Sequence, residues 1–217
     1  MTASEMNYEL EIRLRGLPDA AKQMFITLDR NKYLNEAQTE FFLAAYRTFD
    51  RTELEKKVLS KLVEHFQSTT FTQSSIDLPN GYIVNLPNTL EFVLEEFVQY
   101  VGDNTIVQVF PIKYNYYVSN IDNPFKQPYE EMVWRLDINN NHEIITDGVH
   151  NLAKYVARYL RKPVDIDINN GVDCEINSLY HQTIVNSAAS RITAVVLALM
   201  QTQQRNQKQP KNQEENV

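Results

Sequence analysis

The sequence predicts an α+β protein with an N-terminal helical pair, a small central antiparallel β-sheet and a long C-terminal helix. Apolar residues recur at helical spacing through residues 1–67 and again through residues 175–205. Residues 68–168 are instead rich in Pro, Asn, aromatic and β-branched residues and contain several turn sequences, which is typical of strands and loops. We therefore expect a single α+β domain over residues 1–206, with a polar tail after it.

The first two helices have recognisable starts. Thr2 and Glu5 are spaced as a capping box, in which a hydroxyl and a carboxylate each satisfy a free backbone N–H, and this helix should end before Pro18. Asp29 is the expected cap of the next helix. The apolar positions of that second helix are Tyr33, Leu34, Ala37, Phe41, Ala44 and Ala45.

A further helix is expected to begin at a second capping box, formed by Thr52 and Glu55. Its apolar stripe contains Leu54, Val58, Leu59, Leu62, Val63 and Phe66. Helical spacing is kept to the end of that stripe, so we expect the helix to continue to residue 66.

The β-rich part should contain two hairpins and a third extended segment. Residues 90–101 keep helical spacing, but their Val, Phe and Tyr content favours a strand, paired across a Gly-Asp-Asn turn with residues 105–110. Residues 132–138 and 143–146 flank an asparagine turn and predict the second hairpin. The third segment runs from Lys154 towards Ile168.

The C-terminal helix is unusual because residues 192–200 are apolar nearly all round. A helix of this kind is buried on more than one side, either inside its own domain or between subunits, and a subunit contact is favoured in a chain of this size. From Gln201 the composition changes to Gln, Asn, Lys and Glu, so residues 207–217 are expected to form a disordered polar tail.

Composition and charge exclude several classes of protein. A hydrophobic content of 43% over 217 residues suits a globular chain, and the apolar run Ile192–Met200 is far short of the roughly 20 residues that span a bilayer. The net charge of −7 argues against nucleic acid as the main partner, since phosphate binding requires clustered Lys and Arg. One cysteine allows no internal disulfide, and five scattered glycines form no phosphate-binding loop.

Residues 164–175 are the segment that most resembles a metal site, because Asp165, Asp167 and Asn169 alternate like the first ligands of a calcium loop. That loop requires Gly at its sixth position and Glu at its twelfth, where this chain has Asn170 and Ile176. We therefore interpret the segment as a strand with Val164, Ile166 and Ile168 inward, followed by a turn.

Other candidates for catalysis are equally weak. Cys174 and His181 lie two helical turns apart, about 10 Å, which is too far for a hydrogen bond. Neighbouring carboxylates such as Glu95 and Glu96 are expected to lie on solvated faces. We predict no catalytic residue, no cofactor and no metal ion.

Residues 114–136 are the strongest candidate for a contact surface, because aromatic side chains between rigid prolines offer a large area at little conformational cost. The residues selected as a protein interface are Asn123, Pro124, Phe125, Lys126, Pro128 and Trp134. The alternative is that these aromatic side chains fill the edge of the domain's own core.

Three parts of the chain resemble virion structural proteins of the crAss-like tailed bacteriophages, in particular the ring, or adaptor, proteins beneath the portal. These parts are Tyr33–Gln38 with Phe41, Phe42 and Arg51–Lys57; Asn123–Pro128 with Trp134–Leu136; and Tyr155–Pro163 with Asp173–Glu175 and His181. In this order they cover most of residues 2–195.

The resemblance implies a non-enzymatic homo-oligomeric ring at the head-to-tail junction, assembled in the host cytoplasm, that joins head to tail and lines the DNA passage. Its implied partners are copies of itself, the portal protein and other neck or tail ring proteins, with at most transient contact with passing DNA and no membrane. Two alternatives stay open: a cytosolic adaptor or scaffold unrelated to virions, and, least favoured, a metal-dependent enzyme using Asp165, Asp167 and Asp173.

Overall fold

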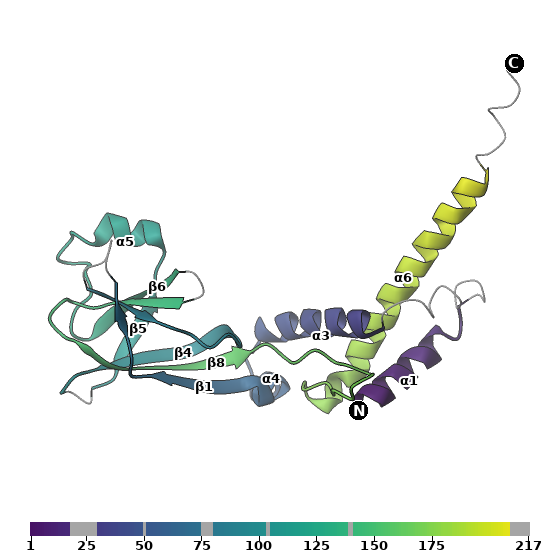
Figure 1. Ribbon diagram of the computed structural model, residues 1–217, viewed down its shortest axis with the longest axis horizontal. Coiled ribbons are helices and arrows are strands. Elements are labelled where there is room, and N and C mark those ends of the chain that lie inside the picture. The colour runs from purple at the N-terminus through teal and green to yellow at the C-terminus, as the bar shows by residue number, and fades with distance from the viewer. Residues whose placement is uncertain (18–29, 50, 75–79, 103–104, 139–140, 209–217) are drawn as a thin grey trace, which may run out of the picture. The chain divides into compact units, whose positions relative to one another are not determined.

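The computed structural model describes residues 1–17, 30–49, 51–74, 80–102, 105–138 and 141–208 (Figure 1). The chain divides into two compact units. The helical unit contains residues 1–62 together with the chain from Pro163 onward, and the β unit contains Val63–Lys162. The single α+β domain expected over residues 1–206 stays a prediction.

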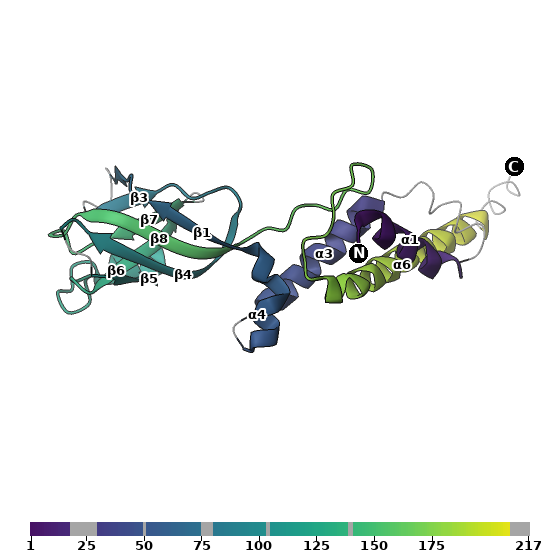
Figure 2. The same cartoon turned by 90° about the horizontal axis from the view of Figure 1, so that it is seen from below.

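The helical unit is built around the long C-terminal helix. Its elements are α1 (Ala3–Leu14), α3 (Arg30–Tyr46), α4 (Glu53–Leu59), the 3₁₀ turns η1 (Ser60–Leu62) and η2 (Ser178–Tyr180), and α6 (His181–Lys208). Both α1 and α3 pack against α6 (Figure 2). The expected capping box starts α1, because the Glu5 N–H donates to Thr2 Oγ1 over 3.2 Å and the Thr2 N–H donates to Glu5 Oε2 over 2.8 Å.

The core of this unit lies where the apolar stripes of the helices meet. Its buried residues include Met6, Leu10 and Leu14 of α1, Leu34, Ala37 and Phe42 of α3, and Ile184, Val185, Ala188, Ile192 and Val196 of α6. Polar contacts flank the core: Arg13 Nε donates to Asn186 Oδ1 over 2.5 Å, and Arg191 lies 2.5 Å from a carboxylate oxygen of Glu40. The three helices therefore share one apolar seam.

An extended segment, residues 163–177, is bound to α3 by side-chain amides. Asn35 accepts the Ile166 N–H over 2.6 Å and donates to the Ile166 carbonyl over 3.0 Å. Gln38 donates to the Val164 carbonyl over 2.9 Å, and Asn31 accepts the Ile168 N–H over 3.1 Å. These amides satisfy backbone groups that have no neighbouring strand.

The β unit is one eight-stranded sheet, which is larger than the small sheet expected. Its strands are β1 (Val63–Ser68), β2 (Thr72–Gln73), β3 (Gly81–Val84), β4 (Leu90–Tyr100), β5 (Val107–Pro111), β6 (Met132–Ile138), β7 (Asn141–Ile145) and β8 (Leu152–Arg161). Their order is β1-β8-β4-β5-β6-β7-β3-β2. All pairs are antiparallel except β5 with β6, which are parallel because helix α5 (Tyr114–Asn120) lies between them in the chain.

The sheet must curl, because its two edge strands are close in sequence. Only residues 69–71 separate β1 from β2, and such a link spans at most about 14 Å. The face with the larger core carries Val84, Val98, Tyr100, Val107, Val109, Val133, Ile144, Leu152, Tyr155 and Ala157. On the other face, Tyr117 of α5 packs on Trp134, Leu136 and Ile145.

Both predicted hairpins are confirmed. Strands β4 and β5 pair through Val98↔Val107, and β6 and β7 pair from Trp134↔Ile145 to Ile138↔Asn141. The third extended segment is β8, which ends at Arg161, before Pro163, because proline supplies no N–H to continue a ladder.

The prediction that the helix beginning at the second capping box continues to Phe66 is wrong, and only its first part is helical. Helix α4 ends at Leu59, and residues 63–68 form β1, whose register with β8 runs from Val63↔Leu160 to Ser68↔Tyr155. The helical and β parts therefore meet between residues 62 and 63 rather than 67 and 68. A long-range ladder partner outweighs the local helical spacing here.

Other expected boundaries also change. The second capping box is half formed: Thr52 Oγ1 accepts the Glu55 N–H, while the Glu55 carboxylate accepts from the Thr52 hydroxyl instead of its N–H. Helix α6 begins at His181 rather than residue 175 and continues to Lys208. The expected cap Asp29 and residues 209–217 lie outside the described residues.

We expect Gly148→Ala to destabilise the β unit by about 1 kcal/mol or more beyond the cost of Gly102→Ala. Both glycines have positive φ, 79° and 82°, but a Cβ at Gly148 would lie 2.5 to 2.9 Å from the side chain of Asn80, whereas a Cβ at Gly102 would meet nothing within 4 Å. Denaturant unfolding followed by the fluorescence of Trp134, the only tryptophan, measures this difference. If both variants lose the same free energy of unfolding, the close approach of the new Cβ to the Asn80 side chain has no effect on stability.

Candidate functional site

The predicted contact loop, Asn123–Pro128, lies within residues 121–131, which form a hydrogen-bonded conformation of their own. Asn123 accepts the Phe125 N–H at Oδ1 over 3.1 Å, and its carbonyl accepts the Lys126 N–H over 2.9 Å. At the end of the loop, Tyr129 and Met132 exchange both of their backbone hydrogen bonds, over 2.8 and 3.1 Å. The side chain of Gln127 donates to the Ile121 carbonyl across the loop.

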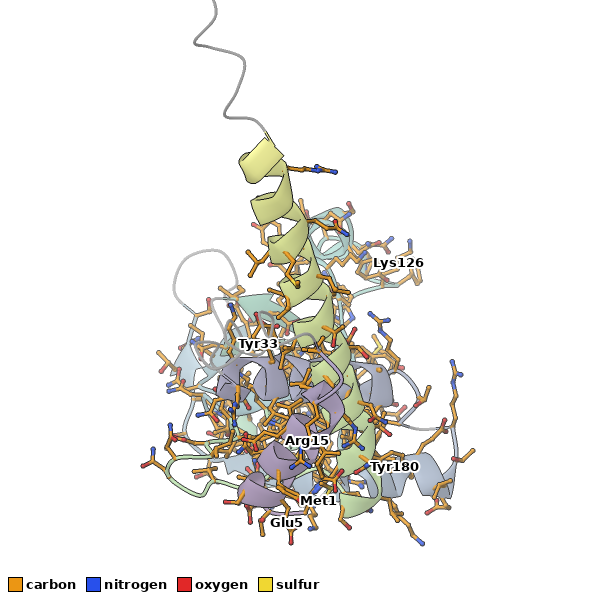
Figure 3. All side chains as sticks on the ribbon, turned by 90° about the vertical axis from the view of Figure 1, so that its right-hand side faces the viewer. Met1, Glu5, Arg15, Tyr33, Lys126 and Tyr180 are labelled. Carbon is orange, nitrogen blue, oxygen red and sulfur yellow. The ribbon has the colours of Figure 1, made fainter. Side chains whose placement is uncertain are left out.

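The structure separates the predicted interface residues into an exposed tip and a buried base. Phe125 is 95% exposed, and Pro124 and Lys126 beside it are also exposed, while Pro128 is buried against the β unit. Figure 3 labels Lys126 on this loop. The alternative that Phe125 fills the core of its own domain is therefore wrong.

Trp134 does not belong to this exposed tip. It lies on β6 with only 2% of its surface accessible, and its ring meets that of Tyr116 edge-on at 5.6 Å. Ile145 and Leu136 complete the cluster beneath α5. Trp134 therefore supports the element that precedes the loop, and it is unavailable to another chain in this conformation.

Of the three aspartates of the metal hypothesis, Asp165 is exposed, and the other two accept hydrogen bonds that support local structure. Asp167 accepts hydrogen bonds from Asn169 and Asn170, and the Asn170 side chain contributes most to holding the pKa of Asp167 below its usual value. Asp173 accepts the Ala3 N–H over 2.6 Å at the start of α1. Within the described ranges, no three His, Cys, Asp or Glu side chains are grouped closely enough to hold a metal ion.

The expected strand over residues 164–168 is only partly observed. Ile166 is buried, but Val164 is exposed, and the ladder is reduced to one bridge between Asp167 and Val172. The turn that follows has Gly171 at a φ of 68°.

Cys174 and His181 are both buried and do not form a pair. Burial raises the pKa of the Cys174 thiol to about 11, so the thiolate is scarce at neutral pH. His181 Nε2 lies 2.7 Å from the Ile176 carbonyl, which places the ring as a structural donor at the start of α6.

A buried polar network inside the β unit was not anticipated from the sequence. Glu96 of β4 lies 2.5 Å from Arg135 Nη1 of β6, and the Tyr155 hydroxyl of β8 donates to Glu96 Oε2 over 2.8 Å. His142 Nδ1 of β7 lies 2.8 Å from the same hydroxyl. Because that hydroxyl proton points to Glu96, the His142 Nδ1–H is the donor to the Tyr155 oxygen.

Neighbouring Glu95 and Glu96 have opposite environments, so the expectation that both lie on a solvated face is wrong for Glu96. Glu95 is exposed and lies 3.4 Å from Arg158, whereas the Glu96 side chain is 6% exposed. Burial raises the pKa of Glu96, although the charge of Arg135 and the Tyr155 hydrogen bond oppose this. Burial also lowers the pKa of His142 to about 3, with a smaller contribution from the Arg135 charge.

The sequence pattern of a family described as phage tail ring protein 3/4 matches residues 1–210. The chain belongs to this family. Ring protein 3 of Bacteroides phage crAss001 is 27% identical, covering 75% of this chain and 84% of that protein. Ring protein 4/5 of the same phage is 24% identical, covering 87% of this chain and 90% of that protein.

Family membership confirms the resemblance predicted from the sequence and identifies the chain as a structural ring protein of a bacteriophage virion. In this ring protein, the exposed loop tip at Phe125 is a candidate contact, and the Glu96 network is a buried structural element. The signal for the loop was its proline-flanked phenylalanine. The network had no local signal, because its four residues come from four strands.

We expect the free energy of unfolding of the β unit to fall as the pH drops from about 6.5 towards 3, because of His142. Unfolded, His142 has an ordinary pKa near 6.5 and takes up a proton, whereas the folded state keeps it neutral down to about pH 3. This linkage amounts to about 1.4 kcal/mol per pH unit relative to His142→Asn, which keeps an N–H donor for Tyr155.

Glu96 has the opposite effect on the free energy of unfolding, since its raised pKa favours the folded state as the pH falls. Both the wild-type protein and His142→Asn contain Glu96, so its contribution is the same in the two. Denaturant titrations followed by Trp134 fluorescence at several pH values measure the difference. Parallel stability profiles of the two proteins would contradict the assignment to His142.

Proposed function

We propose that this ring protein forms a homo-oligomeric ring at the head-to-tail junction of the virion, next to the portal protein and other neck or tail ring proteins. The observation that carries the proposal is the family match along residues 1–210, which covers both units. In this proposal the ring joins head to tail, and the genome passes through its centre. The chain would assemble in the host cytoplasm.

The charge of the chain agrees with a passage that does not retain DNA. A protein with a net charge of −7 lacks the clustered cations that neutralise phosphates, so contact with the genome would be transient. The same charge also suits a protein with protein partners alone, so it supports the proposal without distinguishing these cases.

The proposed ring has no enzymatic role. Asp167 and Asp173 are engaged in hydrogen bonds that support a turn and a helix start, and the Cys174 thiol is buried with a raised pKa. A metal-dependent enzyme would contain stoichiometric metal, and elemental analysis of purified protein tests this alternative.

The proposed contact surface is the loop tip formed by Asn123, Pro124, Phe125 and Lys126, with Pro128 buried at its base. A phenylalanine that is almost fully exposed is unfavourable in water, and its loop already has the fixed shape that a contact requires. In the proposed ring, a neighbouring copy or the next ring covers Phe125.

Proteomics of purified virions distinguishes this proposal from the cytosolic adaptor. A ring protein is present in virions at a fixed number of copies per particle, and class averages from electron microscopy place it at the head-to-tail junction. Absence from virions would overturn the proposal.

We expect Phe125→Ala to weaken assembly by about 2 kcal/mol, roughly thirtyfold in the association constant, because truncating a buried interface aromatic has about this cost. Sedimentation at increasing concentration measures association, and thermal unfolding of the dilute protein should be unchanged. Val149→Ala is the matched control, since Val149 is another exposed apolar residue of the β unit, 78% accessible, in a different loop. If only the unfolding curve moves, the interface assignment is wrong.

A further inference from the structure

The sequence contains two Asn-Gly dipeptides, Asn80-Gly81 and Asn170-Gly171. In such a pair the backbone nitrogen of glycine can attack the side-chain carbonyl carbon of asparagine, because glycine has no Cβ to hinder the approach and leaves the backbone free to rotate. The product is a five-membered succinimide ring. The reaction in a folded protein depends on how tightly the backbone and the amide are held, and the two pairs differ in this respect.

The pair Asn170-Gly171 lies in an open turn of the helical unit. Both residues are exposed, and Gly171 has a φ of 68°. A Cβ on Gly171 would meet nothing within 4 Å, and among the residues that the structure describes the Gly171 N–H has no hydrogen-bond acceptor. The attacking nitrogen is therefore unoccupied, and the turn has room to rearrange.

The pair Asn80-Gly81 is held in place by the β unit. Gly81 is buried as the first residue of β3 and is in register with Ile145 of β7. The Asn80 carbonyl accepts the Thr146 N–H over 3.1 Å, and the Asn80 side-chain amide lies against Gly148, where a Cβ would come within 2.5 to 2.9 Å of it. The rotation that brings the Gly81 nitrogen to the amide carbon would break these contacts, so the same dipeptide is protected here.

A carboxylate holds the Asn170 amide beside its turn. Asn170 Nδ2 donates to Asp167 Oδ2 over 2.5 Å, and Asp167 Oδ1 accepts the backbone N–H groups of Asn169 and Asn170 over 2.9 and 3.2 Å. Asp167 and Val172 close the turn with two backbone hydrogen bonds of 3.1 and 2.9 Å. Asn31 of α3 also donates to Asp167 Oδ1, over 3.2 Å, so the turn is joined to α3. The hydrogen bond from the Asn170 amide is exposed to water, which can replace it, so it restrains the amide only weakly.

We propose that Asn170 is a site of spontaneous deamidation. The Gly171 nitrogen forms a bond to Asn170 Cγ and loses its proton, and the side-chain nitrogen leaves as ammonia, which gives the succinimide. Water then opens the ring at either carbonyl and gives aspartate or isoaspartate at position 170. In total one amide and one water become one carboxylate and one ammonium ion, so no other reactant is needed.

The product cannot keep the present structure of the turn. A carboxylate at position 170 has no N–H for Asp167 Oδ2, and it adds a second negative charge beside the first. Isoaspartate also inserts a methylene group into the backbone between Asp167 and Val172, whose two hydrogen bonds require the present spacing. Because Asp167 also accepts from Asn31, deamidation weakens the attachment of the turn to α3. A virion protein is not replaced after assembly, so the modified turn accumulates in it.

Peptide mapping by mass spectrometry tests the site. The full chain is incubated in warm, mildly alkaline buffer, either folded or in urea, and the conversion of the two Asn-Gly pairs is followed over time. In urea both should convert at similar rates, because glycine follows both asparagines. In the folded protein Asn170 should convert many times faster than Asn80.

Isoaspartate at position 170 is identified by its methylation by protein isoaspartate methyltransferase with S-adenosylmethionine. Asn170→Gln is the matched control and should stay unmodified, because its longer side chain would have to form a six-membered ring. An Asn170 that keeps its amide in the folded protein while it converts in urea would overturn the proposal. Equal conversion of Asn80 and Asn170 in the folded protein would also overturn it.

The effect on the turn is tested with a substitution that mimics one product. Asn170→Asp should lower the melting temperature of the helical signal in circular dichroism more than Asn169→Asp does. Both variants add one negative charge to the same turn, but only Asn170→Asp removes the side-chain hydrogen bond to Asp167 Oδ2. Equal melting temperatures would show that this hydrogen bond does not hold the turn, and the proposed weakening at α3 would be wrong.

Discussion

The β unit depends on one buried carboxylate. Glu96 is held by Arg135, by the Tyr155 hydroxyl and, through that hydroxyl, by His142, so one charge links β4, β6, β7 and β8. Removing Arg135 would leave the Glu96 charge uncompensated in the core, which is far more costly than loss of a surface ion pair, and removing the Tyr155 hydroxyl would take a hydrogen-bond donor from Glu96 Oε2. The network therefore makes the relative positions of four strands interdependent.

Strand β6 connects this network to the surface. Consecutive residues of a strand point to opposite faces, so Arg135 reaches Glu96 on one face while Trp134 packs beneath α5 on the other. Helix α5 leads directly into the loop that carries Phe125. An exposed side chain on a loop whose base is buried loses little conformational freedom when a partner covers it, which is the property that a repeated contact requires.

Features that depend on local chemistry could be predicted from the sequence. The Thr2–Glu5 capping box and both hairpins follow from residues within a few positions of each other. Strand β1 could not be predicted, because its helical spacing was overridden by β8, far along the chain. The burial of Glu96 beside the exposed Glu95 has the same origin: only the pairing of distant strands decides which glutamate faces inward.

The candidate site shows a related limit. Aromatic residues and prolines marked the region 114–136, but aromatic content is the same signal for a core and for a contact surface. Phe125 and Trp134 come from this one region and lie at opposite extremes of exposure. Their secondary structure explains the difference. Trp134 is on strand β6, and its side chain points to the sheet face that α5 covers, whereas Phe125 lies in a loop that belongs to neither sheet face.

A closed ring explains why one chain would carry several different contact surfaces. A copy within a closed ring has two different neighbours' surfaces to meet, so it must carry more than one kind of contact surface. The helical unit offers the apolar end of α6, with Leu197 and Leu199 exposed, and the β unit offers the single exposed aromatic side chain of Phe125 on a loop of defined shape. An apolar helix end contributes buried area to an interface. A single aromatic side chain instead fixes how two neighbouring copies are positioned, because it fits only where the neighbour has a matching cavity. In the proposed ring, affinity would therefore come mainly from α6 and positional specificity mainly from the Phe125 loop.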